Sequence, residues 1–422
     1  MRGRALVFFT TKIHQMRIAI IGQGYVGLTI TAGAVEAGHQ VIGVDKNELV
    51  VEGLNSGRSH IEGIDDNLLK GALKSGNFKA TEDFKEIVGC EIVIIAVPTP
   101  LDSQGKPDLT LLESACDSIA PFLNRDTLVI NESTSFAGTL RNVIAARINA
   151  INSSVQYFAI SPERVDPGNK NYGVKNTPRL VGGLNSKSTE MAAAFYSTFC
   201  SQVVKVSSPE VAEAAKLLEN TFRFVNIGFI NEFTNLMNSM GIPALEVIDA
   251  AATKPYGYMK FTPNVGIGGH CIPVDPLYLQ KNAEEIGVPT RFISVSDSLN
   301  KDMPGYAIKR LEQLHGSLIG QSILVVGVSY KPNIADTRET PAEHVIDGLK
   351  ELGAKVSWHD PLISNFNGTK SSAVSGDYDL ALVLVAHDSL DFRSWNGNPI
   401  YCVNFDPKFP DWIPILGESP KD

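Results

Sequence analysis

The sequence predicts an α/β protein in which a long central helix joins two Rossmann-like, doubly wound parallel-sheet domains. Three observations lead to this prediction. Short apolar runs alternate with helical stretches early in the chain, one long helical pattern follows, and a second alternation begins near residue 321. Strands that alternate with helices are typical of a parallel sheet with helices on both faces. A chain of 422 residues also exceeds what one hydrophobic core usually organises.

The first alternating segment, residues 16–206, is interpreted as an N-terminal dinucleotide-binding domain. Its apolar runs predict strands at Arg17–Ile21, Gln40–Val44, Glu91–Val97, Thr127–Asn131, Gln156–Ile160, Arg179–Gly182 and Gln202–Val206. The stretches between them predict helices at Tyr25–Ala37, Leu109–Leu123, Gly138–Asn149 and Ser186–Phe199. Residues 1–15 are expected to be an extension before the fold, since their apolar part is short for a signal peptide.

A central helical region, residues 207–305, is expected to follow. Ser207-Ser-Pro-Glu210 is interpreted as a capping box, with Ser207 as the N-cap. The helical pattern then runs to about Met240, which predicts one long helix that acts as a spine between domains or as a dimer contact. A further helix is expected around Pro276–Ile286.

The second alternation predicts a C-terminal domain, residues 306–422, that repeats the architecture of the first. Strands are expected at Ser322–Val326, Lys355–Trp358, Leu380–Ala386 and, as the last, Ile400–Asn404, with a helix at Pro341–Leu352.

Composition narrows the classes of partner. The formal net charge of −9 gives no electrostatic footprint for nucleic acid or anionic membranes. The five cysteines are widely spaced and form no CxxC pair, which favours reduced thiols in a cytoplasmic protein over disulfides or a zinc site. The apolar runs are too short to span a bilayer. We therefore expect no metal, no nucleic acid and no membrane partner.

A glycine fingerprint, Gly22-Gln-Gly-Tyr-Val-Gly27, follows the first strand and opens the first helix. The first glycine permits a tight turn, the second allows the backbone to approach a pyrophosphate, and the third permits close helix packing. Asp45 closes the next strand and is expected to accept hydrogen bonds from a ribose diol, which favours NAD over NADP; the adjacent Lys46 slightly weakens that preference. The predicted cofactor contacts here are Gly22, Gly24, Tyr25, Val26, Gly27, Asp45 and Lys46.

The segment Gly266–Pro276 sets Cys271 among glycines and prolines, with Asp275 four residues later. A thiol in such a turn is open to substrate and can attack an aldehyde carbon. A nearby carboxylate can orient or deprotonate a water. Taken alone, Cys271 is more often a small buried hydrophobe. His270 is disfavoured as its base because adjacent residues usually point apart.

Lys216 and Asn220 lie four residues apart in the long helical pattern, so they share one helix face with Glu213. Taken alone, this pattern favours a solvated polar stripe. Similarly, Glu163 in Ser161-Pro-Glu-Arg164 is compatible with an ordinary turn cap.

Taken together and in this order, the motifs resemble the UDP-glucose/GDP-mannose dehydrogenase family over essentially the whole chain from Met16. The marks of the resemblance are the glycine fingerprint, Val97-Pro-Thr-Pro100, Glu132-Ser-Thr134, Ser161-Pro-Glu-Arg164, Lys216 with Asn220, Gly266–Pro276, and Tyr330-Lys331 with Asp336 and Arg338. The Gly-Gly-x-Cys-x-Pro-x-Asp element is highly specific.

The resemblance implies an NAD-dependent, four-electron oxidation of a sugar nucleotide from the C6 alcohol to the carboxylate. Cys271 would form a thiohemiacetal and then a thioester, which holds the carbon for the second oxidation. Lys216 and Asn220 would stabilise oxyanions. Asp275, with a water held by Thr134, would assist hydrolysis, and Glu163 would act as an acid/base or orient the substrate.

The same resemblance implies further contacts in both ligand sites. Thr99, Thr134 and Arg338 look like NAD contacts, although Arg338 and Lys331 taken alone are compatible with surface ion pairs to Asp336. The implied substrate contacts are Glu163, Arg164, Lys216, Asn220, Lys260, Phe261, Asn264, Gly268, His270 and Lys331.

The substrate is expected to be a UDP-N-acetylhexosamine. UDP-glucose dehydrogenases usually carry a lysine before the aspartate, whereas this chain has Val274 there and His270 before the cysteine. These residues look more like the branch that acts on UDP-N-acetylhexosamines, with UDP-N-acetylglucosamine as first choice and UDP-N-acetylmannosamine as second, for polysaccharide biosynthesis. The alternatives are a UDP-glucose 6-dehydrogenase, a two-electron hydroxyacid-type NAD dehydrogenase, and a non-catalytic nucleotide-sugar sensor. A homodimer or higher homo-oligomer is expected.

Overall fold

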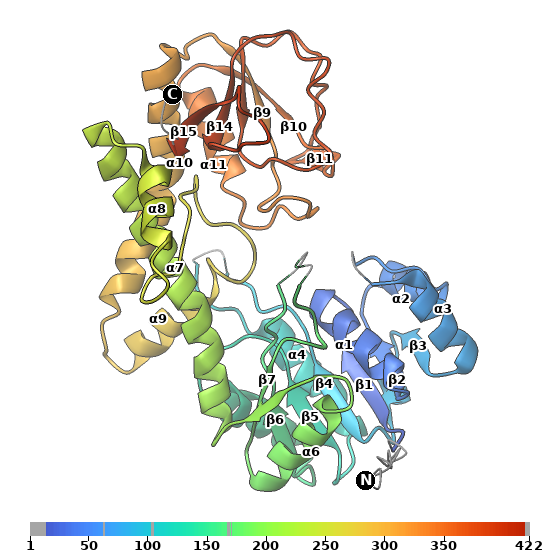
Figure 1. Cartoon of the computed structure of the whole chain (residues 1–422). Helices are drawn as coiled ribbons and strands as arrows, with labels where there is room; N and C mark the ends of the chain where they lie inside the picture. Colours follow the sequence, from blue (N-terminus) through green and yellow to red (C-terminus); the bar gives the residue numbers. More distant parts are fainter. Residues whose placement is uncertain (1–13, 62–63, 103–104, 167–168, 170, 418–422) are drawn as a thin grey trace, which may run out of the picture. The chain divides into compact units, whose positions relative to one another are not determined.

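The computed structural model describes residues 14–61, 64–102, 105–166, 169 and 171–417, so residues 1–13 of the expected extension lie outside it. The chain divides into two compact units, one ending at Lys216 and the other beginning at Leu217. Each unit contains a sheet with packed helices, and one helix, α7 (Pro209–Met240), includes the boundary (Figure 1). The predicted fold class is confirmed: α/β, with two Rossmann-like sheet domains and a long helix between them in the chain.

The first unit is built on an eight-stranded sheet in the order β3-β2-β1-β4-β5-β6-β7-β8. Its strands are β1 (Arg17–Ile21), β2 (Gln40–Val44), β3 (Phe78–Thr81), β4 (Ile92–Ile95), β5 (Leu128–Asn131), β6 (Tyr157–Ile160), β7 (Arg179–Gly183) and β8 (Val203–Lys205). β7 pairs with β6 in the antiparallel sense, whereas the sequence predicted a parallel sheet. A parallel return needs a crossover, usually a helix, and the described residues between β6 and β7 form none.

Helices cover both faces of this sheet because its strands alternate apolar side chains between two cores. Ile18 and Ile20 of β1 belong to one core, and Ala19 and Ile21 belong to the other. The helices of this unit are α1 (Tyr25–Glu36), α2 (Glu48–Asn55), α3 (Asp66–Ser75), α4 (Thr110–Ile119), α5 (Ala146–Ile151) and α6 (Ser186–Tyr196), with short turns η1 (Phe84–Ile87) and η2 (Ala120–Phe122) and a π-helical segment η3 (Leu140–Ala145) before α5.

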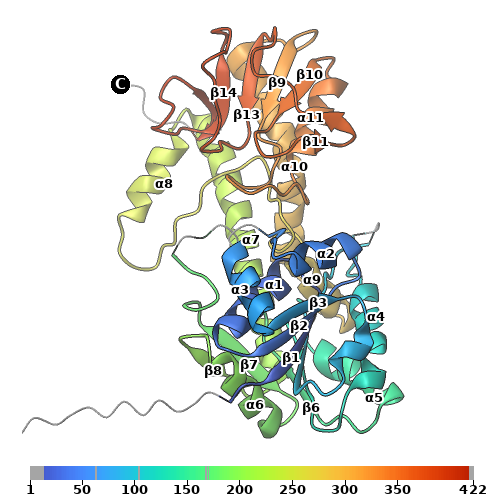
Figure 2. The ribbon, with the colours of Figure 1, turned by 90° about the vertical axis from the view of Figure 1, so that its right-hand side faces the viewer.

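The second unit contains a five-stranded, all-parallel sheet in the order β10-β9-β13-β14-β15, and Figure 2 shows β14, β13, β9 and β10 in sequence across it. Its strands are β9 (Ser322–Val326), β10 (Lys355–His359), β13 (Leu380–Val383), β14 (Ile400–Asn404) and β15 (Ile413–Gly417), with a small hairpin of β11 (Asn365–Phe366) and β12 (Thr369–Lys370). Its helices, besides most of α7, are α8 (Ala244–Ala252), α9 (Asp275–Glu285), α10 (Arg291–His315) and α11 (Ala342–Glu351).

Among the elements of the second unit that were not predicted are β15 and α10. The strand β15 lies beyond Ile400–Asn404, which was wrongly taken as the last strand. The 25-residue helix α10 contains Pro304 in its interior, followed by Gly305. In a sequence, a proline and a glycine side by side normally indicate the end of a helix, so the continuous helix was missed. Pro304 is buried within α10, so packing holds the helix together across the proline.

The start of α7 also differs from the predicted capping box. The helix begins at Pro209, so Ser208 rather than Ser207 stands at the cap position. The carboxylate of Glu210 accepts a hydrogen bond from Nε of Arg141 at 2.8 Å.

A buried carboxylate ties α7 to the neighbouring π-helical segment. Glu213 is 1% exposed, and its two oxygens accept hydrogen bonds from the backbone amides of Gly138 (2.6 Å) and Leu140 (2.8 Å). The carboxylate therefore satisfies amides at the start of η3. Burial raises the pKa of Glu213 to about 7. The interpretation of Glu213 as part of a solvated stripe is wrong.

In the ranges that the structure describes, no helix is both long and apolar enough to span a membrane.

The raised pKa of Glu213 predicts a pH-dependent contribution to folding. The folded state holds the proton more tightly than the unfolded chain, so this contribution is complete below the usual pKa of 4.5 and is lost as pH rises through about 7. We expect the melting temperature of the wild type to fall more between about pH 5 and pH 8 than that of Glu213→Gln, as measured by calorimetry. Glu210→Gln, on the same helix, is the control and should follow the wild type. Parallel curves for the wild type and Glu213→Gln would contradict this assignment.

Candidate active site

The glycine fingerprint of the first unit forms a turn that only glycine fits at two of its positions. A Cβ at Gly22 would lie 2.4 Å from the carbonyl oxygen of Ala96, and one at Gly27 would lie 1.8 Å from the carbonyl oxygen of Gly22. The position of a Cβ at Gly24, by contrast, has no protein atom within 4 Å. The turn therefore leaves open space beside Gly24, directly before α1, where a pyrophosphate can approach the backbone and the helix amides.

Asp45 braces this turn from the end of β2. Its Oδ2 accepts a hydrogen bond from the amide of Gln23 at 2.8 Å, and its Oδ1 accepts one from the amide of Asn47 at 2.9 Å. A carboxylate has further lone-pair sites, which leaves capacity for a ribose hydroxyl. The neighbouring Lys46 donates from Nζ to the hydroxyl of Ser114 on α4 at 3.0 Å. The turn and the acidic residue therefore fit an NAD site.

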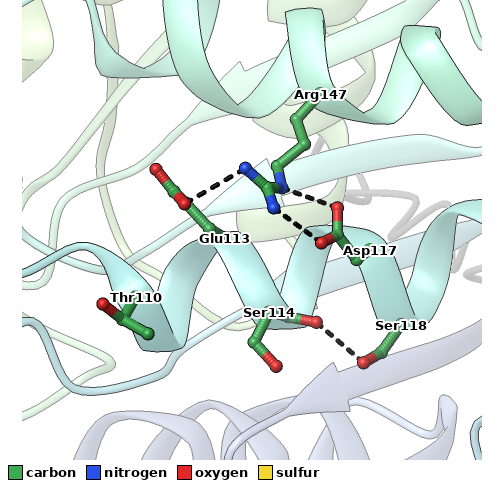
Figure 3. Close-up of a pocket in the computed structure, with 6 residues that line it drawn as sticks. All are labelled: Thr110, Glu113, Ser114, Asp117, Ser118 and Arg147. Carbon is green, nitrogen blue, oxygen red and sulfur yellow. Dashed lines mark hydrogen bonds and ion pairs between the residues drawn. The ribbon is translucent and has the colours of Figure 1, made fainter.

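A shallow cavity of about 350 Å³ beside α4 is separate from this predicted NAD site (Figure 3). Arg147 donates to both oxygens of Asp117 at 2.6 and 2.7 Å and to Glu113 at 3.1 Å. The ion pairs occupy its charged groups, and none of the predicted site residues lines it. The lining residues are Thr110, Glu113, Ser114, Asp117, Ser118 and Arg147.

The loops after β4 and β5 bring two predicted NAD contacts together. The hydroxyl of Thr99 donates to the carbonyl oxygen of Thr134 at 2.8 Å. The hydroxyl of Ser133 donates to the carbonyl oxygen of Val97 at 2.7 Å and accepts from the amide of Val97 at 3.0 Å. The two loops are therefore tied at two adjacent positions.

Glu163 lies in a buried ionic network rather than at a free acid position. Its Oε2 accepts from Nη2 of Arg179 at 2.7 Å, and its Oε1 accepts from the amides of Arg164 and Val165 at 2.6 Å each. Burial opposes ionisation of Glu163, but Arg179 and the two amides outweigh burial and lower its pKa. A carboxylate held ionised cannot donate a proton at neutral pH, which favours an orienting role over that of a general acid. The guanidinium of Arg164 donates to the carbonyl oxygen of Pro178 at 2.6 Å.

The same arginine also binds Glu132, which the sequence indicates only as part of a motif. Nη1 of Arg179 lies 2.7 Å from each oxygen of Glu132, and the hydroxyl of Tyr196 donates to this carboxylate. Burial raises the pKa of Glu132 to about 7 despite the arginine. Arg179 begins the otherwise apolar strand β7, and a charged residue in that position is the one signal in the sequence that a buried acidic partner exists.

In the second unit, Cys271 differs from the other cysteines in its exposure. It is the exposed thiol among the five, all of which the structure describes. Burial raises the pKa of Cys90 and Cys200 to about 11 and that of Cys116 and Cys402 to about 12. The interpretation of Cys271 as a small buried hydrophobe is therefore wrong, and this thiol is accessible to a substrate.

A single turn joins Cys271 to Asp275, and a hydrogen bond joins Asp275 to α7. The carbonyl oxygen of Cys271 accepts from the amide of Asp275 at 2.9 Å. Nδ2 of Asn220 donates to Oδ2 of Asp275 at 2.5 Å, and both side chains are buried. Lys216, four residues before Asn220 in α7, is also buried at 9% exposed. The solvated-stripe interpretation is wrong for these residues too.

The side chain of Tyr330 packs directly against the two glycines that precede His270 and Cys271 in the cysteine loop. A Cβ at Gly269 would lie 2.8 Å from the Tyr330 ring, and one at Gly268 would lie 2.7 Å from Cβ of Tyr330. Gly269 also has a φ of +89°, and its amide donates to the carbonyl oxygen of Arg338 at 2.9 Å. The two glycines therefore allow a close approach that a side chain would prevent.

His270 is half-buried directly before the thiol. Burial and then the positive charge of Arg338 lower the pKa of His270, so its imidazole is neutral at neutral pH. Arg338 itself is bound to Asp336, with Nη2 to Oδ2 at 2.6 Å. This is the ion pair that the simpler interpretation of Arg338 expected. Lys331 is half-buried in the loop after β9.

The segment of predicted substrate contacts before the cysteine loop is anchored by residues that were not predicted. Oδ1 of Asn231 on α7 accepts from the amide of Asn264 at 2.9 Å, and Nδ2 of Asn404 donates to the carbonyl oxygen of Pro263 at 2.8 Å. Lys260 is exposed and paired with Asp249 of α8. Nothing in the sequence near Asn231 or Asn404 signals these long-range contacts.

The structure therefore brings together Thr99 and Thr134 in the first unit and Asn220, Asp275 and Cys271 in the second. Phe261 makes an edge contact with the ring of Phe222 of α7, with centroids 6.0 Å apart. The residues that the structure describes contain no cluster of three or more His, Cys, Asp or Glu side chains arranged for a metal ion.

Substitution of Gly269 by alanine tests the packing of Tyr330 under the loop. The added Cβ meets the ring and the backbone conformation is unfavourable, so we expect Gly269→Ala to lower the free energy of unfolding by about 1–3 kcal/mol, measured by chemical denaturation. In a Tyr330→Ala background the cost should fall to the conformational part alone.

Gly305→Ala is the matched control because a Cβ at Gly305, inside helix α10, would meet no atom within 4 Å apart from the nearby backbone of the helix itself. An equal effect of Gly269→Ala and Gly305→Ala on stability would refute the packing argument.

Family models for three consecutive domains match the chain. These are the NAD binding domain of the UDP-glucose/GDP-mannose dehydrogenase family over residues 16–200, its central domain over 210–302 and its UDP binding domain over 324–399. The glycine turn and Asp45 lie in the first of these ranges, and Cys271 lies in the second.

Curated relatives and solved structures agree with these matches. A UDP-N-acetyl-D-mannosamine dehydrogenase of Pyrococcus horikoshii is 34% identical over 91% of this chain and 92% of its own length. A UDP-N-acetyl-D-glucosamine 6-dehydrogenase of Pseudomonas aeruginosa is 32% identical over 89% and 91%. The structure of a UDP-glucose dehydrogenase from Pyrobaculum islandicum superposes with a TM-score of 0.87 at 26% identity, covering 97% of this chain and 99% of that one. The chain therefore belongs to the UDP-glucose/GDP-mannose dehydrogenase family.

Proposed function

We propose that this protein oxidises the C6 hydroxyl of a UDP-N-acetylhexosamine to a carboxylate in two NAD-dependent steps, through a thiohemiacetal and a thioester on Cys271. Family membership supports NAD-dependent oxidation of a nucleotide sugar. The observation that carries the covalent part is the exposed thiol of Cys271, one turn from a buried Asp275 that is hydrogen-bonded to Asn220.

In the first oxidation, the amine of Lys216 and the amide of Asn220 assist loss of the C6 hydroxyl proton by stabilising the developing oxyanion. The turn at Gly22–Gly27, which leaves space beside Gly24, would hold NAD, and NAD bound there would supply the hydride acceptor for both oxidations. The product of this step is a C6 aldehyde, which the enzyme must retain.

In the second oxidation, the thiolate of Cys271 adds to the aldehyde carbon and forms the oxyanion of the thiohemiacetal at C6. Hydride loss converts this species into a thioester. Asp275 then assists a water in hydrolysing the thioester, and the thiol of Cys271 leaves as the carboxylate forms. The sum is one alcohol, two NAD and one water giving one carboxylate, two NADH and three protons.

The choice of an N-acetylhexosamine rests on His270 and Val274 in the cysteine loop. Relatives named for UDP-N-acetylmannosamine and for UDP-N-acetylglucosamine are similarly close in sequence, at 34% and 32% identity. Among solved structures, a UDP-N-acetylmannosamine dehydrogenase is 32% identical and the UDP-glucose dehydrogenase is 26% identical. We keep UDP-N-acetylglucosamine as first choice and UDP-N-acetylmannosamine as second. The product would supply polysaccharide biosynthesis, and we expect the reaction in the cytoplasm, where thiols stay reduced.

The direct test is the yield of NADH from a limiting amount of each UDP-sugar. We expect two NADH per molecule of UDP-N-acetylglucosamine or UDP-N-acetylmannosamine and slower turnover of UDP-glucose. Cys271→Ala should abolish this yield, while Cys90→Ala, at a buried thiol in the first unit, should retain it. One NADH per sugar would indicate a two-electron dehydrogenase, and nucleotide binding without turnover would indicate a sensor.

We also propose that α7 forms a homodimer contact. Large apolar side chains recur along one face of this helix in the second unit at spacings of four and seven residues, and each is 45–66% exposed. A second copy of the same stripe covers such a face in a two-fold dimer. The side chains are Leu218, Phe222, Phe229, Leu236 and Met240.

A charge in this stripe should weaken the dimer. We expect Phe229→Glu with Leu236→Glu to shift the mass seen by light scattering from twice 45.6 kDa to 45.6 kDa. Ile319→Glu replaces an exposed apolar residue outside the stripe and should leave the dimer intact. An unchanged mass of the double variant would rule out this contact.

A further inference from the structure

The turn after β9 in the second unit repeats the backbone design of the dinucleotide turn after β1. Gly22 and Gly327 have φ values of +90° and +81°, and their amides donate to the last residues of β2 and β10, Val44 and His359, at 2.8 Å each. A Cβ at Gly327 would lie 2.2 Å from the carbonyl oxygen of Val385, as one at Gly22 would meet Ala96. Asp360 follows β10 as Asp45 follows β2.

Asp360 nevertheless has a different task from Asp45, because its acceptor sites are already used. It is 3% exposed, and its Oδ2 accepts from the amides of Val328 (2.9 Å) and Ser329 (3.2 Å). Its Oδ1 accepts from the amides of Leu362 (2.8 Å) and Ile363 (3.2 Å). A buried carboxylate with these partners cannot receive a ribose hydroxyl.

His387 completes the network and fixes the other end of the same loop. It is 1% exposed, and its Nδ1 accepts from the amide of Asn333 at 2.9 Å. Its Nε2 must therefore carry the hydrogen, which it directs toward Oδ2 of Asp360 at 3.2 Å and the hydroxyl of Ser329 at 2.9 Å.

The loop that Asp360 and His387 hold in this way carries Tyr330 and Lys331. Tyr330 packs against Gly268 and Gly269, which precede the nucleophile. Lys331, next to it, is the predicted substrate contact. Asp360 binds the backbone before these two residues, and His387 binds it after them, at Asn333.

We propose that His387, acting with Asp360, is a positioning residue that holds Tyr330 under the cysteine loop and Lys331 at the diphosphate of the substrate. Neither residue touches the substrate, because both are buried. The part of this proposal that concerns Lys331 rests on the proposed function, whereas the part that concerns Tyr330 rests on the packing of the second unit alone.

Two substitutions separate positioning from simple filling of the core. His387→Asn keeps an acceptor near the position of Nδ1, so it retains the bond to the amide of Asn333. His387→Gln is polar and closer in length to histidine, but it places its amide at the far end and loses that acceptor. If His387 positions the loop, His387→Gln should be the more damaging variant. If His387 only fills space in the core, His387→Asn should be the more damaging one, because asparagine is the shorter side chain.

The measurements are the dissociation constant of UDP, by calorimetry, and the rate of Cys271 alkylation by iodoacetamide, which reads the exposed thiol. We expect His387→Gln to weaken UDP binding about tenfold and to change the alkylation rate about threefold or more. His387→Asn should stay close to the wild type in both, as should His344→Asn, at an exposed histidine of α11. Melting curves verify that each variant is folded.

Equal UDP affinities and equal alkylation rates for His387→Asn and His387→Gln would overturn the proposal. If the wild type fails to bind UDP, the proposed function is contradicted instead, and the alkylation rates still decide whether His387 positions Tyr330.

Discussion

The close approach of Tyr330 to Gly268 and Gly269 is the constraint on which the cysteine loop depends. An added Cβ at either glycine would overlap with Tyr330, and Gly269 also requires a left-handed backbone. On the far side of the nucleophile, one turn leads to Asp275, which Asn220 holds against α7. The loop is therefore supported both before and after Cys271, so the thiol is exposed while the backbone that carries it is fixed.

Buried carboxyl groups in this protein mainly hold loops in place. Glu213 binds the amides at the start of η3, Glu163 binds those of Arg164 and Val165, and Asp360 binds the turn after β9. Leaving such a buried group without its partners is costly, since an unsatisfied donor or acceptor loses about 1–3 kcal/mol and an unpaired charge more. This explains why acidic residues near the proposed chemistry have their oxygens occupied and why Glu163 suits an orienting role.

The parts of the fold and site that sequence predicts are those with local causes. The glycine turn at Gly22–Gly27 and the cysteine loop appear in the sequence because a close backbone approach leaves only glycine possible. The roles of Arg179, Asn231 and His387 could not be predicted, because their partners lie far away in the chain. The antiparallel β7 depends on a connection without a helix, and α10 was missed because Pro304 is tolerated only through its burial in the folded core.

The central claim is that Cys271 carries the substrate carbon between the two oxidations. Because Asp275 is proposed to assist hydrolysis, Asp275→Asn should slow release of the thioester and let it accumulate. Mass spectrometry of acid-quenched Asp275→Asn, after incubation with NAD and the UDP-sugar that is turned over, tests this most directly. We predict a sugar-nucleotide adduct on the peptide that contains Cys271. A wild type that yields two NADH per sugar, together with no adduct on this variant or an adduct on another residue, would contradict the account.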